Sequence, residues 1–294
     1  MTYTHFDVAD SGKIRTVTFN RPEKRNTFTM EMCLELGRLF DRVDADDDVR
    51  VVILTGSGPA FCAGAELSEG FISDAELTEE QRAMVAEVGT VDGVSRDPGG
   101  WLALKIARST KPVIVAFNGA AVGIGVTMSL PADIRIAAES ARFGFVFTRR
   151  GIVPEAGSTW FLPRLVGISQ AVEWVVTGRV FGAEEALRGR LVNYVVPDDQ
   201  LLTKARELAT EIVESTSAVS VAAARRMLWH GLELPSPWYG HAAESHGMFA
   251  MGASPDGREG VASFLEKRPA EFPMSVADEL PGFVPDWPAR PADL

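Results

Sequence analysis

The sequence predicts an α/β fold with a mainly parallel sheet, and three observations support this. Runs rich in β-branched residues occur at 14–20, 49–55, 111–117 and 133–137. Segments with helical periodicity or with closely spaced glycines separate these runs. Apolar residues make up 46% of the 294 residues and charged residues 23%, as in an ordinary globular protein. Strands that alternate with helices form right-handed crossovers, so neighbouring strands are expected to be parallel.

The first helix is expected at 29–44, between the first two strands. Its apolar residues recur close to helical spacing and are Met30, Cys33, Leu34, Phe40 and Val43.

The stretch 112–132 carries no charge and has the length of a membrane span. It is interrupted by Asn118, Gly119, Gly123 and Gly125, which a regular spanning helix would not favour. We therefore interpret it as a buried strand, a glycine turn and a buried helix, and we expect no membrane association.

After residue 168 the pattern is mainly helical. Apolar residues form one stripe over 201–213, and a short helix is expected at 259–268 with a cap near Ser254. The remaining tail is rich in proline and is expected to be an extended arm or partly disordered. We divide the chain into a core at 1–200, a helical region at 201–272 and a Pro-rich tail at 273–294.

Charge and cysteine content exclude several classes of protein. A formal net charge of −11 argues against sequence-independent binding of nucleic acid. Cys33 and Cys62 do not form a Cys-x-x-Cys pair, so neither a disulfide scaffold nor a cysteine-based zinc site is expected. The two cysteines suit a reducing compartment, and the N-terminal residues lack the apolar stretch of a signal peptide, so we expect a cytoplasmic protein.

Metal and serine-hydrolase chemistry are also disfavoured. The four histidines have no metal-ligand spacing, so no metal site is expected. No Gly-x-Ser-x-Gly nucleophile elbow occurs.

Two glycine-containing turns follow predicted strands, at 61–67 and 118–126. Small residues allow the backbone to approach a ligand, and a helix that starts there offers free N–H groups. Two such turns side by side can direct two N–H groups at one oxygen, the geometry of an oxyanion hole. Each turn alone is equally consistent with a tight connection that binds nothing. The second turn is not a dinucleotide fingerprint, because Met128 stands at the third glycine position.

Glu155 lies in the motif 151–159 between small and apolar residues. A carboxylate in apolar surroundings has a raised pKa, which suits a proton shuttle. The alternative is that Glu155 caps the N-terminus of a helix.

Six segments together resemble the crotonase superfamily, also called the enoyl-CoA hydratase/isomerase family, over about residues 6–272. They are Asn-Arg-Pro-Glu-Lys-Arg-Asn at 20–26, Phe-Cys-Ala-Gly-Ala-Glu at 61–66, the segments 111–119, 132–137 and 151–159, and Phe-Leu-Glu-Lys-Arg at 264–268. The resemblance implies a crotonase-like spiral of ββα units with the CoA site in 1–200. It also implies that 201–272 mediates a homotrimer, often paired as a dimer of trimers.

The resemblance implies an acyl-CoA substrate and an enolate intermediate. Coenzyme A enters as part of the substrate, and no metal or redox cofactor is implied. The N–H groups of Ala65 and Ile124 would hold the thioester oxygen. The implied CoA contacts are Lys24, Arg25, Ala63 and Ala65, with Phe264 and Lys267 covering the adenine, often from a neighbouring subunit.

The departures from the hydratase pattern favour isomerisation. Thr127 and Phe147 stand where hydratases of the family have two glutamates, whereas Glu155 stands where isomerases place a carboxylate. We therefore expect an enoyl-CoA isomerase in which Glu155 moves a proton. The segment 68–100 is long enough to shape the acyl end of the pocket.

Two alternatives remain open. One is another lyase, hydrolase or hydratase of the superfamily acting on a bulky acyl-CoA. Five aromatic residues would then line its pocket: Phe143, Phe145, Phe147, Trp160 and Phe161. The alternative is that these side chains pack in the core, which is the commoner fate of aromatic residues. The other possible function is that of an acyl-CoA-binding protein without activity.

Overall fold

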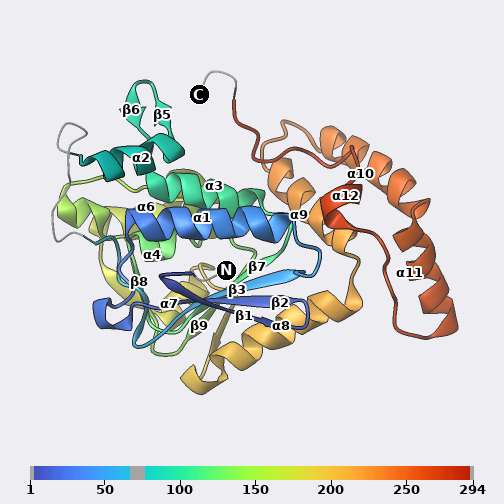
Figure 1. Ribbon diagram of the computed structural model, residues 1–294, viewed down its shortest axis with the longest axis horizontal. Helices are drawn as coiled ribbons and strands as arrows, with labels where there is room; N and C mark the ends of the chain where they lie inside the picture. The colour runs from blue at the N-terminus through green and yellow to red at the C-terminus, as the bar shows by residue number, and fades with distance from the viewer. Residues whose placement is uncertain (1–2, 67–76, 292–294) are drawn as a thin grey trace.

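Six strands form the larger sheet of the computed structural model, which describes residues 3–66 and 77–291 (Figure 1). Their order is β1 (Phe6–Ser11), β2 (Ile14–Phe19), β3 (Val51–Gly56), β7 (Val113–Phe117), β9 (Ile134–Ala138) and β12 (Tyr194–Val196). β1 pairs with β2 antiparallel, and every later neighbour pairs parallel. The predicted α/β fold with a mainly parallel sheet is therefore confirmed.

A second sheet is made of strands of three residues each. They are β4 (Ala60–Cys62), β8 (Ala120–Val122), β10 (Arg142–Gly144) and β11 (Val180–Gly182). β3, β7 and β9 of the larger sheet are each followed in the chain by one of these strands. The chain therefore alternates between the two sheets as it advances, which is the predicted spiral.

The helices around the site begin at recognisable caps. Thr29 caps α1 (Met30–Asp44), whose buried face contributes to the main core as predicted. Asp97 caps α3 (Pro98–Arg108), and the uncharged stretch forms β7, β8 and α4 (Ile124–Thr127). Among the residues that the structure describes, no helix is long and apolar enough to cross a membrane.

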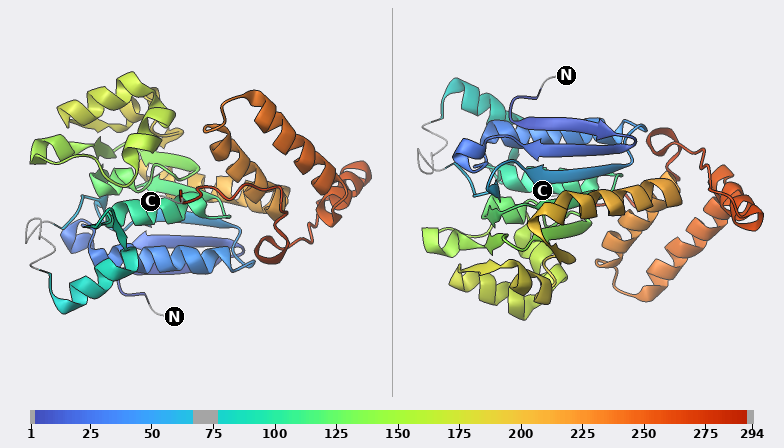
Figure 2. Two further views of the ribbon diagram at one scale, coloured as in Figure 1. Left: turned by 90° about the horizontal axis from the view of Figure 1, so that it is seen from above. Right: turned by 90° about the horizontal axis from the view of Figure 1, so that it is seen from below.

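α8 (Leu201–Ser215) packs against the larger sheet, which places the first helix of the 201–272 region on the core. α9 (Ala218–Gly231) also contacts the core, through Arg225 and Trp229. α10 (Pro237–Gly252) and α11 (Pro255–Glu266) extend away from it to one side (Figures 1 and 2). Ser254 caps α11, as the sequence predicted.

The remaining elements complete the surface. They are η1 (Pro22–Lys24), α2 (Glu79–Val88), β5 (Thr90–Val91), β6 (Val94–Ser95), η3 (Val146–Arg150), α5 (Ser158–Val166), α6 (Ile168–Thr177), α7 (Ala183–Arg188), η4 (Asp198–Gln200) and α12 (Val276–Glu279).

The proline-rich tail runs back over the core as an extended arm after α12. Trp287 is 2% exposed, and its ring stacks on that of Trp229 with centroids 5.5 Å apart. Its indole N–H donates to Glu233 Oε1 over 3.0 Å. The described part of the tail is therefore held by this buried side chain, in addition to an ion pair of Asp286 with Arg108.

Candidate active site

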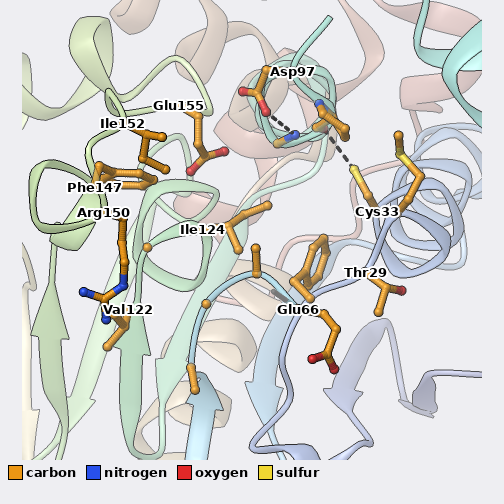
Figure 3. Close-up of a pocket in the computed structure, with 18 of the residues that line it drawn as sticks. Thr29, Cys33, Glu66, Asp97, Val122, Ile124, Phe147, Arg150, Ile152 and Glu155 are labelled. Carbon is orange, nitrogen blue, oxygen red and sulfur yellow. Dashed lines mark hydrogen bonds between the residues drawn. The ribbon is translucent and has the colours of Figure 1, made fainter. Parts of the chain in front are cut away.

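A cavity of about 660 Å³ lies where the two glycine turns, α1, α3 and η3 meet (Figure 3). Its wall combines backbone of the turns with apolar side chains, among them Phe28, Ile124, Phe147 and Ile152. α2 adds Gln81 and Met84. The expectation that 68–100 shapes the pocket is therefore met by α2, whereas residues 68–76 lie outside the described residues.

The two glycine turns lie side by side because β4 and β8 pair in parallel. The contact is close: a Cβ on Gly125 would come within 2.3 Å of the Cys62 carbonyl oxygen, so only glycine fits there. Ile124 begins α4, where a backbone N–H has no partner within the helix. In the described part of the chain, the N–H groups of Ala65 and Ile124 have no hydrogen-bond acceptor. Both residues line the cavity, so two free donors meet there.

Glu155 reaches the cavity from the loop before α5, and its side chain is directed toward Ile124 (Figure 3). Its Oε1 accepts a hydrogen bond from the hydroxyl of Thr127. Its Oε2 is buried and has no hydrogen-bond partner among the described residues. The N-cap of α5 is Gly157 and no side chain caps this helix, so the alternative role of Glu155 as a helix cap is wrong.

Burial is the main cause that raises the pKa of Glu155 to about 8. The negative charge of Asp97 raises this pKa further, while the hydrogen bond from Thr127 opposes the rise. At neutral pH the group therefore exists in both protonation states, which is what acid–base catalysis requires.

Asp97 joins two segments that enclose Glu155. Its carboxylate accepts from the N–H groups of Gly99 and Gly100 at 2.9 and 2.7 Å, and from that of Ala156 at 2.7 Å. Ala156 is buried and has a φ of 59°, a left-handed conformation that is uncommon outside glycine. Our reading of the sequence missed Asp97. The Asp-Pro start of a helix signals the cap, but nothing in the sequence signals the contact with Ala156.

The other carboxylates of the cavity differ from Glu155. Glu66 accepts from the hydroxyl of Thr27 at 3.2 Å and lies 3.8 Å from Arg21, whereas Glu31 is exposed.

Thr127 is fully buried beside Glu155, and Phe147 lines the cavity. The two positions at which hydratases have glutamates therefore offer no carboxylate.

Of the two interpretations of the five aromatic residues, core packing holds for four. Phe143 and Phe145 are fully buried in the main core, where they contact other rings. Trp160 and Phe161 pack against Trp229. Of the five aromatic residues, Phe147 is the one that lines the cavity. These rings fill space between helices and sheets, the usual fate of large apolar side chains.

The residues expected to contact CoA fall into two groups. Ala63 and Ala65 line the cavity, and the N–H of Ala63 donates to the carbonyl of Arg25, next to Lys24. Phe264, which is 81% exposed, and Lys267 are at the far end of the molecule at the end of α11 (Figure 1). One chain alone therefore does not bring the two groups together.

The two cysteines are packing residues here. Burial raises the pKa of the Cys62 thiol to about 12, and it raises that of Cys33 as well. Cys33 donates to the carbonyl of Pro98 over 2.9 Å. Both therefore remain neutral thiols at physiological pH.

Known proteins resemble this chain along most of its length. The family model described as enoyl-CoA hydratase/isomerase matches residues 10–274. An enoyl-CoA hydratase of Alternaria alternata is 40% identical over 93% of this chain and 87% of its own. The 1,2-epoxyphenylacetyl-CoA isomerase of Escherichia coli strain K12 is 33% identical over 88% of this chain and 94% of its own.

A solved structure shares the same fold. The enoyl-CoA hydratase of Bacillus anthracis superposes with a TM-score of 0.79, is 33% identical, and is matched over 92% of this chain and 99% of its own. The match of the family model, the relatives and the spiral of strands agree with one another, and this chain belongs to the enoyl-CoA hydratase/isomerase family.

Proposed function

We propose that the protein is an enoyl-CoA isomerase that moves a double bond from C3 to C2 of an acyl-CoA. The observation that carries this proposal is the buried Glu155, which stands beside two free N–H groups while Thr127 and Phe147 occupy the hydratase positions.

The reaction needs one base, one oxyanion site and no net uptake of water. Glu155 removes a proton from C2 of the 3-enoyl thioester, and the electron pair moves onto the thioester oxygen. The N–H groups of Ala65 and Ile124 donate to that oxygen, which stabilises the dienolate. Protonated Glu155 then returns the proton to C4, which completes a 1,3-shift and restores the carboxylate.

The cavity supports this chemistry in two ways. A pKa of about 8 lets Glu155 accept a proton at C2 and release it at C4 without a large energetic cost in either step. Oε2 is buried against Gly99, so bulk water is kept from this oxygen.

Hydration of a 2-enoyl-CoA is the second candidate, because the relative of 40% identity is named a hydratase. A hydratase of the family uses two carboxylates to hold and activate a water molecule. This cavity offers one buried carboxylate with an oxygen that has no hydrogen-bond partner among the described residues.

One experiment separates the two. The purified protein is incubated with 3-hexenoyl-CoA and, separately, with 2-hexenoyl-CoA in water enriched in ¹⁸O, and the products are followed by mass spectrometry. An isomerase converts 3-hexenoyl-CoA into 2-hexenoyl-CoA without ¹⁸O, and a hydratase converts 2-hexenoyl-CoA into 3-hydroxyhexanoyl-CoA that carries it. Binding without either product indicates an acyl-CoA-binding protein.

We further propose that the protein assembles as a homotrimer or a dimer of trimers through its C-terminal helices. These helices carry large apolar side chains that a single chain leaves exposed: Leu228, Trp238, Tyr239, Met248, Phe249, Val261, Phe264 and Leu265. Assembly would also bring Phe264 and Lys267 toward a neighbouring subunit's CoA site.

A further inference from the structure

Thr127 occupies the position at which a hydratase would have its first glutamate, and it is fully buried at the end of α4. Its hydroxyl is in hydrogen-bond contact with two oxygens. One is Glu155 Oε1, and the other is the carbonyl oxygen of Gly123 at 3.2 Å. A threonine hydroxyl has one proton to donate and two lone pairs with which to accept.

This arrangement suits both protonation states of Glu155. When Glu155 is ionised, or protonated on Oε2, the hydroxyl of Thr127 donates to Oε1. When the proton is on Oε1, Glu155 donates to Thr127, and Thr127 then donates to Gly123. The contact between the two side chains is thus maintained throughout a cycle of proton uptake and release.

The other oxygen of Glu155 is held differently. Oε2 has no hydrogen-bond partner among the described residues and lies against the backbone of Gly99, where an added Cβ would be 1.9 Å away. The side chain is therefore bonded at one oxygen and sterically confined at the other. Such confinement at two points fixes the plane of the carboxylate.

We propose that Thr127 is a positioning residue that holds Oε1 of Glu155 through both protonation states, so that the carboxyl group keeps one direction while it takes up and releases the proton. This inference rests on the proposed isomerase function and assigns a role to a residue at a hydratase position. A β-branched side chain suits this role, because threonine has few χ1 rotamers within a helix and its hydroxyl direction is correspondingly fixed.

Other groups around Glu155 also affect its titration. Asp97 faces it from the start of α3, Cys33 from α1 and Cys62 from β4, while Arg150 of η3 lines the same cavity. None of them is altered by a substitution at Thr127, so a change in the titration of Glu155 can be assigned to the lost hydroxyl.

The test compares Thr127→Val, which keeps the shape and loses the hydroxyl, with Thr127→Ser, which keeps the hydroxyl. Turnover of 3-hexenoyl-CoA by Thr127→Val is expected to fall about 30-fold in kcat with KM little changed, because a misplaced catalytic group costs rate rather than binding. Thr127→Ser is expected to retain kcat within about threefold, because its hydroxyl makes the same bond with more rotamer freedom.

A second readout does not depend on turnover. The infrared carbonyl band of protonated Glu155, identified by its loss in Glu155→Gln, is titrated in the ligand-free proteins. In Thr127→Val the band is expected to shift in frequency, and the pKa of Glu155 is expected to rise because the opposing hydrogen bond is gone. Thr127→Ala serves the same comparison if Thr127→Val does not fold.

An unchanged band and an unchanged kcat in the hydroxyl-free variants would overturn the role of Thr127. Absence of isomerase activity in the unaltered protein would instead refute the proposed function, and the infrared comparison would still report whether Thr127 holds Glu155.

Discussion

Glu155 combines two properties that follow from its surroundings, a raised pKa and a fixed direction. Apolar neighbours disfavour the ionised form, and Asp97 adds a like charge to the same effect. Such a group lowers the stability of the fold when it is ionised, and this cost can be measured.

The sign of the pH dependence follows from the two pKa values of Glu155. The unfolded chain releases its proton near the ordinary value of 4.5, whereas the folded protein retains it up to about pH 8. The free energy of unfolding, relative to that of Glu155→Gln, is therefore highest below pH 4.5 and falls as the pH rises toward about 8. The difference in the free energy of unfolding should fall by on the order of 5 kcal/mol over this interval. Denaturant titrations at several pH values measure it.

Glu184→Gln is the control for these titrations, because the side chain of Glu184 is 90% exposed. A pH dependence that is the same in all three proteins would contradict a raised pKa for Glu155.

Asp97→Asn tests the electrostatic contribution of the neighbouring carboxylate. Removing the charge lowers the pKa of Glu155, so the rise of kcat/KM with pH, which reports the ionised base, should move to lower pH. The amide oxygen can still accept from the N–H groups of Gly100 and Ala156, whereas the bond from Gly99 is lost because the amide nitrogen cannot accept. Asp199→Asn, at an exposed position of η4, should leave the profile unchanged. A profile that does not move in Asp97→Asn would show that the charge of Asp97 does not act on Glu155.

The local motif of the sequence singled out Glu155, and the family resemblance singled out Ala65 and Ile124. The fold brings all three to one cavity, whereas the contacts around Glu155 were not predicted. Asp97 contacts Ala156 across 59 positions of the chain, and Thr127 contacts Glu155 across 28. Such contacts depend on how the strands stack, which no local pattern encodes.

At the scale of elements, the start of α3 closes one side of the active site. Gly99 packs directly against the carboxylate of Glu155, whereas a Cβ on Gly100 would be 3.0 Å from Asp97 Oδ2. An alanine substitution at each of these two neighbouring glycines is therefore expected to have a different effect, and one serves as the control for the other.

Gly99→Ala is expected to displace Glu155 and to lower kcat about 100-fold, because a shift of about 1 Å at a catalytic group has an effect of this size. Gly100→Ala is expected to have a much smaller effect, since its methyl group meets only the edge of the capping carboxylate. Steady-state kinetics of both variants with 3-hexenoyl-CoA provide the measurement. Equal rates in the two variants would argue that α3 does not set the position of Glu155.

Sequence patterns predicted long elements better than short ones. The strands of the larger sheet near residues 14, 51, 113 and 134 and the helix at 30–44 were expected, because each has several residues of clear periodicity. The strands of the second sheet have three residues each, too few to show an alternation. β1 was missed because most of its residues are exposed and polar, and α3 because it begins with Pro-Gly-Gly.

At the scale of the whole molecule, the C-terminal helices lie to one side (Figure 2), and their large apolar side chains are exposed. Phe249 on α10 is 84% exposed. We expect an apolar side chain that is this exposed to be covered by another subunit. The sequence predicted a mainly helical region here, but not which helix faces are covered within the chain, because that depends on the direction in which the helices leave the core.

Phe249→Lys is expected to shift the protein toward smaller species, because a buried charge at an apolar interface is costly. Light scattering coupled to gel filtration measures the mass of the assembly. Val94→Lys is the control, since Val94 is an apolar side chain, 60% exposed, on β6 and remote from these helices. An unaltered protein that is already monomeric would refute assembly, and an unchanged mass in Phe249→Lys would exclude α10 from the interface.

The central claim is that one carboxylate, Glu155, carries a proton from C2 to C4 of the acyl chain. The most direct measurement uses 3-hexenoyl-CoA with deuterium at C2, and it follows the position of the label in the 2-hexenoyl-CoA that forms. We expect part of the deuterium at C4 with the unaltered protein, and a loss of conversion of about 1,000-fold in Glu155→Gln. Conversion with no deuterium at C4, or with Glu155→Gln as active as the unaltered protein, would contradict the account.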